Sequence, residues 1–468
     1  MMRKKIHLLS LRNVISHFAV RGSGGAGLVA VGILLILPAL AGAQGGHPLT
    51  LDEAVRRALA NAPELGEAQS DIDLMSAKLA EAKGYRFAKI DFLGLTGPVP
   101  RARGNQVSSP DTGSELNHLG WFERGDVTLV QPIYTFGKIS NAMTAATHGV
   151  KVEQARREQR RNEIALKVKE YYYSVLLARE MKEVLCEVRE DLNKARDTAQ
   201  KLLAKESENV EEADLFKLAA FNGEVGNYLA QAEKGETLAL SALSVRMGGT
   251  TDVVPDLGDQ RLALVDVPLE RFEAYAERAK QQRPEFKQVS EGLQARSALV
   301  EGAKAARYPD LFLGGYLSAA YASQRDKVNN PWIQDNFRHF WGGVALGIKW
   351  GLDFGISSAK IAQEQAQYEK LLSTKAFAEE NIPLQIRKYY DEGVQARTAL
   401  AETKSGYENS KKWAVTSSSN FDFGIGPAKD IFDSLQQYAK MRAAYFQAIY
   451  DYNMAIANLC YATGESPL

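Results

Sequence analysis

Apolar residues recur every three or four positions along most of this chain, which is the spacing of amphipathic helices. From residue 139 to about residue 205 a heptad-like spacing continues without a proline and with a single glycine. A helix of that length reaches on the order of 100 Å, because each residue adds about 1.5 Å. A second such run covers residues 356–420 and contains Pro383, where we expect a kink. The pattern therefore predicts two unusually long helices.

Shorter helices are predicted on both sides of each long one. The first of them begins at Thr50, whose side chain can cap it, with Glu53 three positions later as in a capping box. Pro63 ends that helix, and a further helix follows it. After the long runs, amphipathic stretches predict returning helices over about 210–246 and from near Pro427, where proline is favoured in a first turn. Each long helix and its return would form an antiparallel hairpin.

Four stretches between the helices alternate between apolar and other residues, which is the period of a β-strand. In the clearest stretch the apolar positions are Val344, Leu346, Ile348, Trp350 and Leu352. The positions between them are small or polar and include Lys349 and Asp353. This alternation suits a membrane barrel with lipid outside and water inside, and it suits a half-buried soluble sheet equally well.

Weaker alternation predicts the partner strands, near residues 89–95, 125–134 and 310–321. Polar segments rich in Gly, Pro, Asn and Asp lie between the paired strands and read as exposed loops. Four aromatic residues lie near the strand ends, where a membrane barrel would carry an aromatic girdle: Trp121, Phe122, Phe340 and Trp341. The sequence therefore predicts two strand pairs, each closed by an exposed loop.

The chain contains an internal repeat. Pro63-Glu64-Leu65 returns as Pro284-Glu285-Phe286, and the motif YTFGKIS at Tyr134 returns as LDFGISS at Leu352. We therefore expect one structural unit used twice. The predicted division is a signal peptide, a first repeat, a linker, a second repeat and a C-terminal tail, over residues 1–43, 44–250, 251–267, 268–463 and 464–468.

The start of the chain reads as a secretory signal. Five basic residues precede an uncharged, mostly apolar stretch that ends in Ala41-Gly42-Ala43, which has small residues at the cleavage spacing. The alternative is a retained membrane anchor. Cleavage after residue 43 would leave 52 basic against 57 acidic residues, and this mildly acidic balance argues against a nucleic-acid partner.

Two cysteines and six histidines offer little chemistry. Cys186 and Cys460 lie in separate helical patterns, so we expect two unrelated buried thiols, although a disulfide is possible in an oxidising compartment. The histidines are scattered and form no metal-ligand spacing. No nucleophile–base pattern or phosphate-binding loop occurs. We therefore expect no catalytic residues, no cofactor and no metal site.

Four strands per chain cannot close a barrel, and an open sheet edge in lipid leaves backbone groups without partners. Membrane strands would therefore require oligomerisation. Three chains would supply 12 strands, which is within the range of such barrels. The same three chains would bring their long helices into a cylinder much longer than the hydrocarbon core of about 30 Å, so most of the tube would stand in water.

The segments LTLDEAVRRALANAPEL, QPIYTFGKI and FGIGPAKDIFDSL, together with the repeat order and helix lengths, resemble the TolC-like outer-membrane efflux family. The resemblance covers about residues 48–463. It implies a mainly α fold with membrane β: a homotrimer with a shared 12-stranded barrel and a periplasmic α-barrel of long helical hairpins. It also implies an exported protein of the Gram-negative outer membrane, working with a periplasmic adaptor and an inner-membrane transporter in efflux or type I secretion.

One local site follows from the resemblance. Relatives have a glycine at the tip of the second hairpin, an aspartate six residues later and often another three after that, and these positions are Gly424, Asp430 and Asp433 here. In a trimer the two aspartates would form stacked acidic rings that favour cations at the entrance. Without the resemblance, both acids fit positions near a helix start, where they complement the helix dipole.

The same tip departs from its relatives. They often carry a basic residue two positions after the glycine and a tyrosine before it, whereas this chain has Gly426, then Pro427, and Phe421. The resemblance therefore implies a latch that is weaker or built differently. The first hairpin's tip is acidic, and its acids either add to the field at the entrance or form a solvated turn: Glu206, Glu208, Glu211, Glu212 and Asp214.

A periplasmic coiled-coil adaptor or scaffold is the main alternative function. Such a protein would also be exported and rich in heptads. It would need neither four strands with an outward apolar face nor a twofold internal repeat. Extraction behaviour separates the two classes, because a barrel leaves the membrane only with strong detergent.

Overall fold

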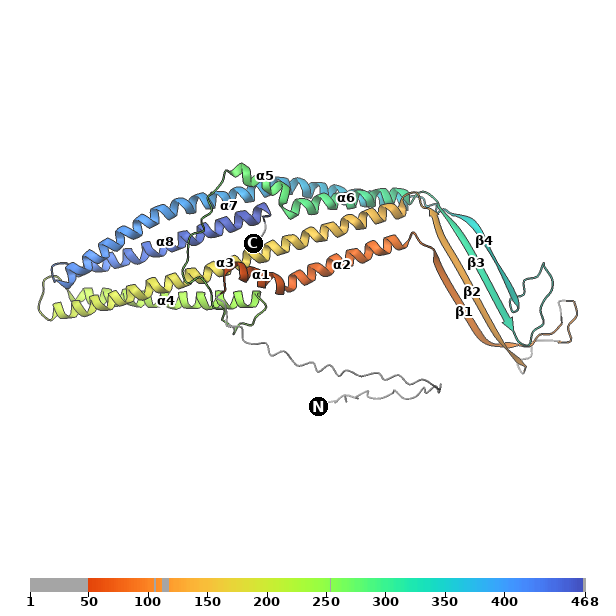
Figure 1. The fold of residues 1–468 in the computed structure, drawn as a ribbon, viewed down its shortest axis with the longest axis horizontal. Coiled ribbons are helices and arrows are strands. Elements are labelled where there is room, and N and C mark those ends of the chain that lie inside the picture. Colours follow the sequence, from red (N-terminus) through yellow and green to blue (C-terminus); the bar gives the residue numbers. More distant parts are fainter. Residues whose placement is uncertain (1–48, 105–106, 112–117, 253, 466–468) are drawn as a thin grey trace, which may run out of the picture. The chain divides into compact units, whose positions relative to one another are not determined.

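The computed structural model describes residues 49–104, 107–111, 118–252 and 254–465 (Figure 1). The predicted signal segment, residues 1–43, lies outside the described residues. The described part is mainly helical and contains one four-stranded antiparallel sheet. The expectation of long helices combined with four strands is confirmed.

The element order helix, helix, strand, strand, long helix, shorter helix occurs twice. The first set comprises α1 (Leu51–Asn61), α2 (Pro63–Gly84), β1 (Lys89–Pro100), β2 (Leu119–Tyr134), α3 (Lys138–Leu203) and α4 (Glu212–Arg246). The second set comprises α5 (Phe272–Gln282), α6 (Pro284–Ala305), β3 (Asp310–Ala322), β4 (His339–Lys349), α7 (Ile356–Asp422) and α8 (Ala428–Thr463).

Local sequence explains how the short helices begin. The hydroxyl of Thr50 accepts a hydrogen bond from the backbone N–H of Glu53 at 3.3 Å, so the predicted cap is present. Pro63 and Pro284 occupy the first position of α2 and α6, where the missing N–H costs no hydrogen bond. The proline that ends one helix therefore begins the next.

The two long helices have 66 and 67 residues. Each therefore extends on the order of 100 Å. α7 continues through Pro383 as a single helix, and the kink at this residue stays a prediction.

α3 is the central helix of the packing (Figure 1). It contacts α2 on one side and α6 on the other, and α6 in turn contacts α7. Along its later part α3 packs on α4 and α8. One apolar core surrounds Val168 and Val175 of α3, and a second core surrounds Leu192 of α3 and Phe421 of α7. These cores follow the predicted apolar seam: Tyr172 is buried in the first core, and Tyr171 is partly buried and packs against it.

The segment 251–267 lies against the helices through backbone contacts. The N–H of Leu262 donates to the carboxylate of Glu180 at 3.1 Å, and the N–H of Val265 donates to the side-chain oxygen of Asn453 at 2.9 Å. Glu180 is buried, and the loss of solvation raises the pKa of its carboxyl group. The backbone N–H groups of this extended segment are thus bonded by buried polar side chains, and not by the carbonyls of a neighbouring strand.

The strands pair in the order β1–β2–β3–β4. The predicted bounds of the last strand were wrong, because β4 begins at His339 and ends at Lys349. Its partner β3 starts at Asp310, which pairs with Lys349, so Trp350 and Leu352 have no neighbouring strand. The indole of Trp350 donates to the carbonyl of Arg307 at 3.0 Å instead.

The prediction that both cysteines are buried was wrong for Cys186, which is exposed. Val184 and Val188 face the core, and Cys186 lies midway between them on the other side of α3. Cys460 is partly buried, and burial raises the pKa of its thiol to about 11. Both thiols are free, so no disulfide links them.

Candidate functional site

The turn between α7 and α8 is set by one glycine. Gly424 has φ +72°, its N–H donates to the carbonyl of Phe421, and the N–H of Ile425 donates to the carbonyl of Asn420. These two bonds are the Schellman pattern that ends helices at a left-handed residue, where glycine avoids a steric penalty. The predicted tip glycine therefore has a structural reason in this chain.

Asp430 and Asp433 lie in the first two turns of α8, which begins at Ala428. The side chain of Asp430 is exposed and that of Asp433 is partly buried. Among the described residues, neither carboxylate has an ion pair or a side-chain hydrogen bond, so both charges remain available to their surroundings. Their positions also fit the favourable end of the helix dipole, so the geometry of one chain allows both predicted roles.

The acidic tip of the first hairpin divides into two kinds of residue. Glu211 and Asp214 form a capping box at the start of α4, in which each side chain bonds the other's backbone N–H. Glu206 adopts φ +55°, an uncommon angle for a residue other than glycine, and it occupies the turn after α3. Two of the five acids are thus explained by helix capping.

The two tips contact each other within one chain. Phe421 is fully buried and packs in a core with residues of α3, α4 and α8. Asn209, in the turn between α3 and α4, bonds the turn that holds Gly424. Sequence reasoning missed Asn209, because an asparagine in a polar turn carries no pattern that points to a distant partner.

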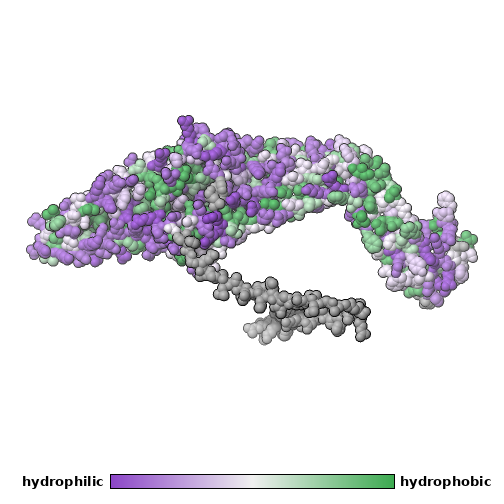
Figure 2. Space-filling model, in the orientation of Figure 1, coloured by the Kyte–Doolittle hydropathy of each residue, from purple (hydrophilic) through white to green (hydrophobic). Residues whose placement is uncertain are grey.

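The sheet has one apolar face and an opposite face that mixes charged residues such as Asp126 and Lys349 with apolar ones such as Leu93. In the observed register, alternate residues of the four strands bring one apolar set together: Ile90, Phe92, Val127, Leu129, Leu313, Leu317, Phe340, Val344, Leu346 and Ile348. Val344 and Leu346 are 80% and 78% exposed in the isolated chain. Figure 2 shows hydrophobic surface over the part of the sheet nearest the helices. An exposed apolar face of this size indicates a surface that is covered by lipid or by another protein chain.

The opposite face carries a polar cluster at its centre. The carboxylate of Asp126 accepts hydrogen bonds from Ser318 at 2.5 Å and from Tyr316 at 3.1 Å, and it pairs with Arg124 at 2.9 Å. Asp126 and Ser318 are buried by these neighbours. The charge of Asp126 is therefore satisfied within one chain.

The expected aromatic girdle is only partly present. Trp121 and Phe340 lie on the apolar face, whereas Phe122 and Trp341 point to the other side, because successive residues of a strand alternate. Phe122 packs on Phe337 of the β3–β4 loop with ring centroids 5.4 Å apart.

A second aromatic group lies at the other end of the strands, where the sheet joins the helices. Tyr134 and Phe136 have ring centroids 4.7 Å apart, and Phe136 stacks on Tyr308 at 5.3 Å. This group was not predicted from the sequence, although aromatic residues flank several of the predicted strands. The two aromatic groups therefore bracket the apolar face along the strands.

The two outermost strands of the sheet are joined in sequence to the two outermost helices of the packed row. Among the described residues, β1 and β4 each have one side without a partner strand. β1 follows α2 and β4 precedes α7, and the helices pack in the order α2, α3, α6, α7. One edge is thus formed by α2 with β1, and the other by α7 with β4.

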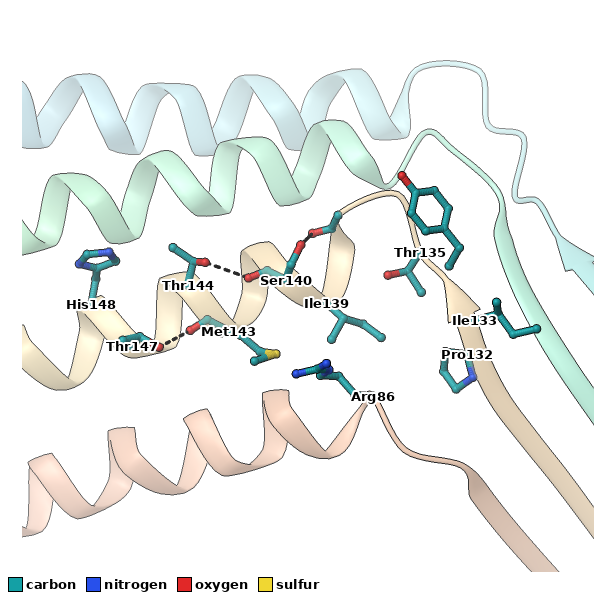
Figure 3. A pocket seen from close by; sticks show the side chains of 12 residues that line it. Arg86, Pro132, Ile133, Thr135, Ile139, Ser140, Met143, Thr144, Thr147 and His148 are labelled. Atoms are coloured by element: carbon teal, nitrogen blue, oxygen red, sulfur yellow. Dashed lines mark hydrogen bonds between the residues drawn. The ribbon is translucent and has the colours of Figure 1, made fainter.

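A pocket of about 790 Å³ lies where the end of α2 faces the start of α3 (Figure 3). Arg86 faces Ile139 and Met143 across it. The hydroxyls of Thr144 and Thr147 donate to carbonyls of their own helix and do not converge on a ligand.

None of the helices in the described residues combines the length and the apolar character that crossing a bilayer requires. The same part of the chain contains no group of three or more His, Cys, Asp or Glu residues arranged to hold a metal ion.

The fold is that of TolC-like outer-membrane channels. The channel OprN superimposes with a TM-score of 0.74 at 15% identity, over 89% of this chain and 90% of that one. The outer membrane protein VceC of Vibrio cholerae gives 0.72 at 14% identity, over 89% and 97%. The MtrE outer membrane channel of Neisseria gonorrhoeae, solved in its open state, gives 0.71 at 15% identity, over 89% of each chain.

Residues 54–205 match the family described as outer membrane efflux protein. The resemblance to this family that the sequence predicted is therefore confirmed. No curated protein sequence matches the chain.

Proposed function

We propose that this chain is one protomer of a homotrimeric outer-membrane channel that serves as the exit duct of a tripartite efflux pump or a type I secretion system. The observation that carries the proposal is the sheet. Its apolar face is exposed in one chain, its opposite face carries the Asp126 cluster, and within the described residues both of its edges lack a partner strand. A soluble monomer gains nothing from this combination, whereas a lipid-embedded ring uses all three features.

Closure follows from the shared edges. In a head-to-tail ring, β4 of one chain pairs with β1 of the next, and α7 packs on the next chain's α2. Three copies give a 12-stranded membrane barrel that continues into a barrel of helices. The helices extend on the order of 100 Å, so the helical barrel projects far into the periplasm of a Gram-negative cell.

The function is passive conduction, and the chain works with a periplasmic adaptor and an inner-membrane transporter. No bound cofactor and no chemical step are needed for a conduit. The coiled-coil adaptor or scaffold alternative accounts for the helices alone. It gives no reason for a sheet with an exposed apolar face bracketed by aromatic residues.

The entrance lies at the helix tips, where Gly424, Gly426 and Pro427 shape the turn that precedes Asp430 and Asp433. The support is that both carboxylates lack side-chain partners among the described residues and stand near the tip. Threefold symmetry would place six carboxylates around one axis. Such rings attract cations and repel anions.

We expect Asp430→Asn/Asp433→Asn to lower the cation preference of single channels several-fold and to weaken block by multivalent cations. The reason is the loss of both acidic rings without a change in side-chain size. The measurement is the reversal potential in a salt gradient across a planar bilayer. Asp451→Asn, which removes an exposed acid from α8 far from the tip, should leave the selectivity unchanged. If the double variant kept the wild-type selectivity, the two aspartates would be helix-start residues and nothing more.

A further inference from the structure

Asn209 joins the two hairpin tips of one chain through two hydrogen bonds. Its side-chain amide donates to the carbonyl of Gly424 at 2.8 Å. Its backbone carbonyl accepts from the N–H of Ala428 at 3.1 Å. One residue of the α3–α4 turn thus bonds both sides of the α7–α8 turn.

One of the two bonded groups is of the kind that helix ends leave without a partner, and the other is a carbonyl of the turn. Ala428 is the first residue of α8, and no side chain caps that helix. Pro427 has no N–H, and the carbonyl of Gly424 lies just beyond the end of α7. Orphan groups of this kind need a partner when they are shielded from water. Asn209 provides a partner for the first N–H of α8 and for the turn carbonyl of Gly424.

No side chain of the second turn can take over this role. Gly426 has no side chain, and Phe421 has no hydroxyl and is fully buried. Within residues 421–427, the side-chain hydrogen bond to the first hairpin is that of the Asp422 carboxylate, which accepts from the hydroxyl of Thr198 at 3.5 Å. The Asn209 bond is shorter and joins the tip glycine itself.

The first tip holds Asn209 in place. The backbone N–H of Asn209 is 3.4 Å from the hydroxyl of Ser207, whose own N–H donates to the carbonyl of Leu202. The next residue, Val210, is buried in the core that contains Phe421. The position of Asn209 is therefore fixed by Ser207 before it and by Val210 after it in the sequence.

We infer that Asn209 is a positioning residue that ties the turn bearing Asp430 and Asp433 to the first hairpin and so holds the entrance in its resting, narrow state. This inference rests on the proposed channel function. In this proposal the tip of the second hairpin moves away from the first when the entrance opens, and the bond between the Asn209 amide and Gly424 breaks. The backbone bond to Ala428 would be lost in the same movement.

The test compares Asn209→Ala and Asn209→Asp with wild type as single channels in a planar bilayer. Alanine removes the donor, and aspartate also places a carboxylate against the carbonyl of Gly424. We expect the open probability to rise about 5- to 10-fold for alanine, which corresponds to one lost hydrogen bond, and further for aspartate. Asn222→Ala is the matched control, because Asn222 bonds Asn193 at 3.1 Å within the first hairpin. It should leave the open probability unchanged.

A distance measurement separates failure of this inference from failure of the channel proposal. Spin labels are attached to cysteines at Lys205 and Phe423, both exposed and on different tips, in chains with Cys186→Ser and Cys460→Ser. Labelled chains are diluted into unlabelled ones so that each oligomer carries one pair. We expect a single short distance in wild type and a longer, broader distribution in both Asn209 variants.

Three outcomes are informative. Longer distances together with raised open probability support the inference. Unchanged distances in the Asn209 variants overturn it, even if the channel conducts. Longer distances in an oligomer that never conducts keep Asn209 as the tie between the tips and overturn the channel function.

Discussion

Val344→Arg is expected to prevent the chain from assembling in the outer membrane. Val344 lies in the middle of β4 on the apolar face, and it is 80% exposed in the isolated chain, so the substitution disturbs no contact within the fold. In a bilayer, an arginine on the lipid-facing side costs about 2–4 kcal/mol near the midplane, and a trimer carries it three times. The measurement is the amount of heat-resistant oligomer in the outer-membrane fraction.

Ala345→Arg is the control for this experiment. Ala345 is also exposed and is the next residue of the same strand, but its side chain points to the opposite face, which carries the Asp126 cluster. An arginine there reaches water inside the proposed barrel and should allow normal assembly. Equal loss of assembly in both variants would contradict the assignment of one face to lipid and the other to water.

Phe421→Ala is expected to loosen both hairpin tips strongly. Phe421 is fully buried between helices of the two hairpins. Truncation of a buried phenylalanine typically costs about 3–5 kcal/mol, because transfer free energy is lost and a cavity remains. The measurement is hydrogen exchange of backbone amides at the end of α3 and the start of α8, where protection should fall by several orders of magnitude.

Phe423→Ala provides a matched comparison, because Phe423 lies two residues away and is 81% exposed. Its removal should change the same protection by less than about 0.5 kcal/mol. If the two variants behaved alike, the tips would not share a core in the assembled protein. In that case the tie between the hairpins proposed for Asn209 would also lose its packing support.

The helices could be predicted well because their signals are long and local. An apolar seam repeated over more than sixty residues cannot be mistaken for a strand, and caps such as Thr50 mark where helices begin. The internal repeat allowed each element to be predicted a second time, from the other half of the chain. The ends of β4 were harder to predict, since the alternation continues through Leu352 but the partner strand stops opposite Lys349. Pairing across a sheet, not local pattern, decides where a strand ends.

The tip shows a similar limit. The position of Gly424 and the two aspartates could be read from their spacing, and the structure supplies the reason for the glycine. The bond from Asn209 could not be read, because it joins residues 215 positions apart. Cys186 was misplaced because a half-turn along α3 separates a core position from an exposed one. Long-range contacts and the exact face of a helix both depend on tertiary packing.

The most direct test of the proposed conduit is the single-channel conductance of the purified wild-type oligomer in a planar bilayer. We predict discrete, small, cation-selective openings from an oligomer that leaves the membrane only in strong detergent. Absence of any conductance from a folded, detergent-extracted oligomer would contradict the channel and favour an adaptor or scaffold instead.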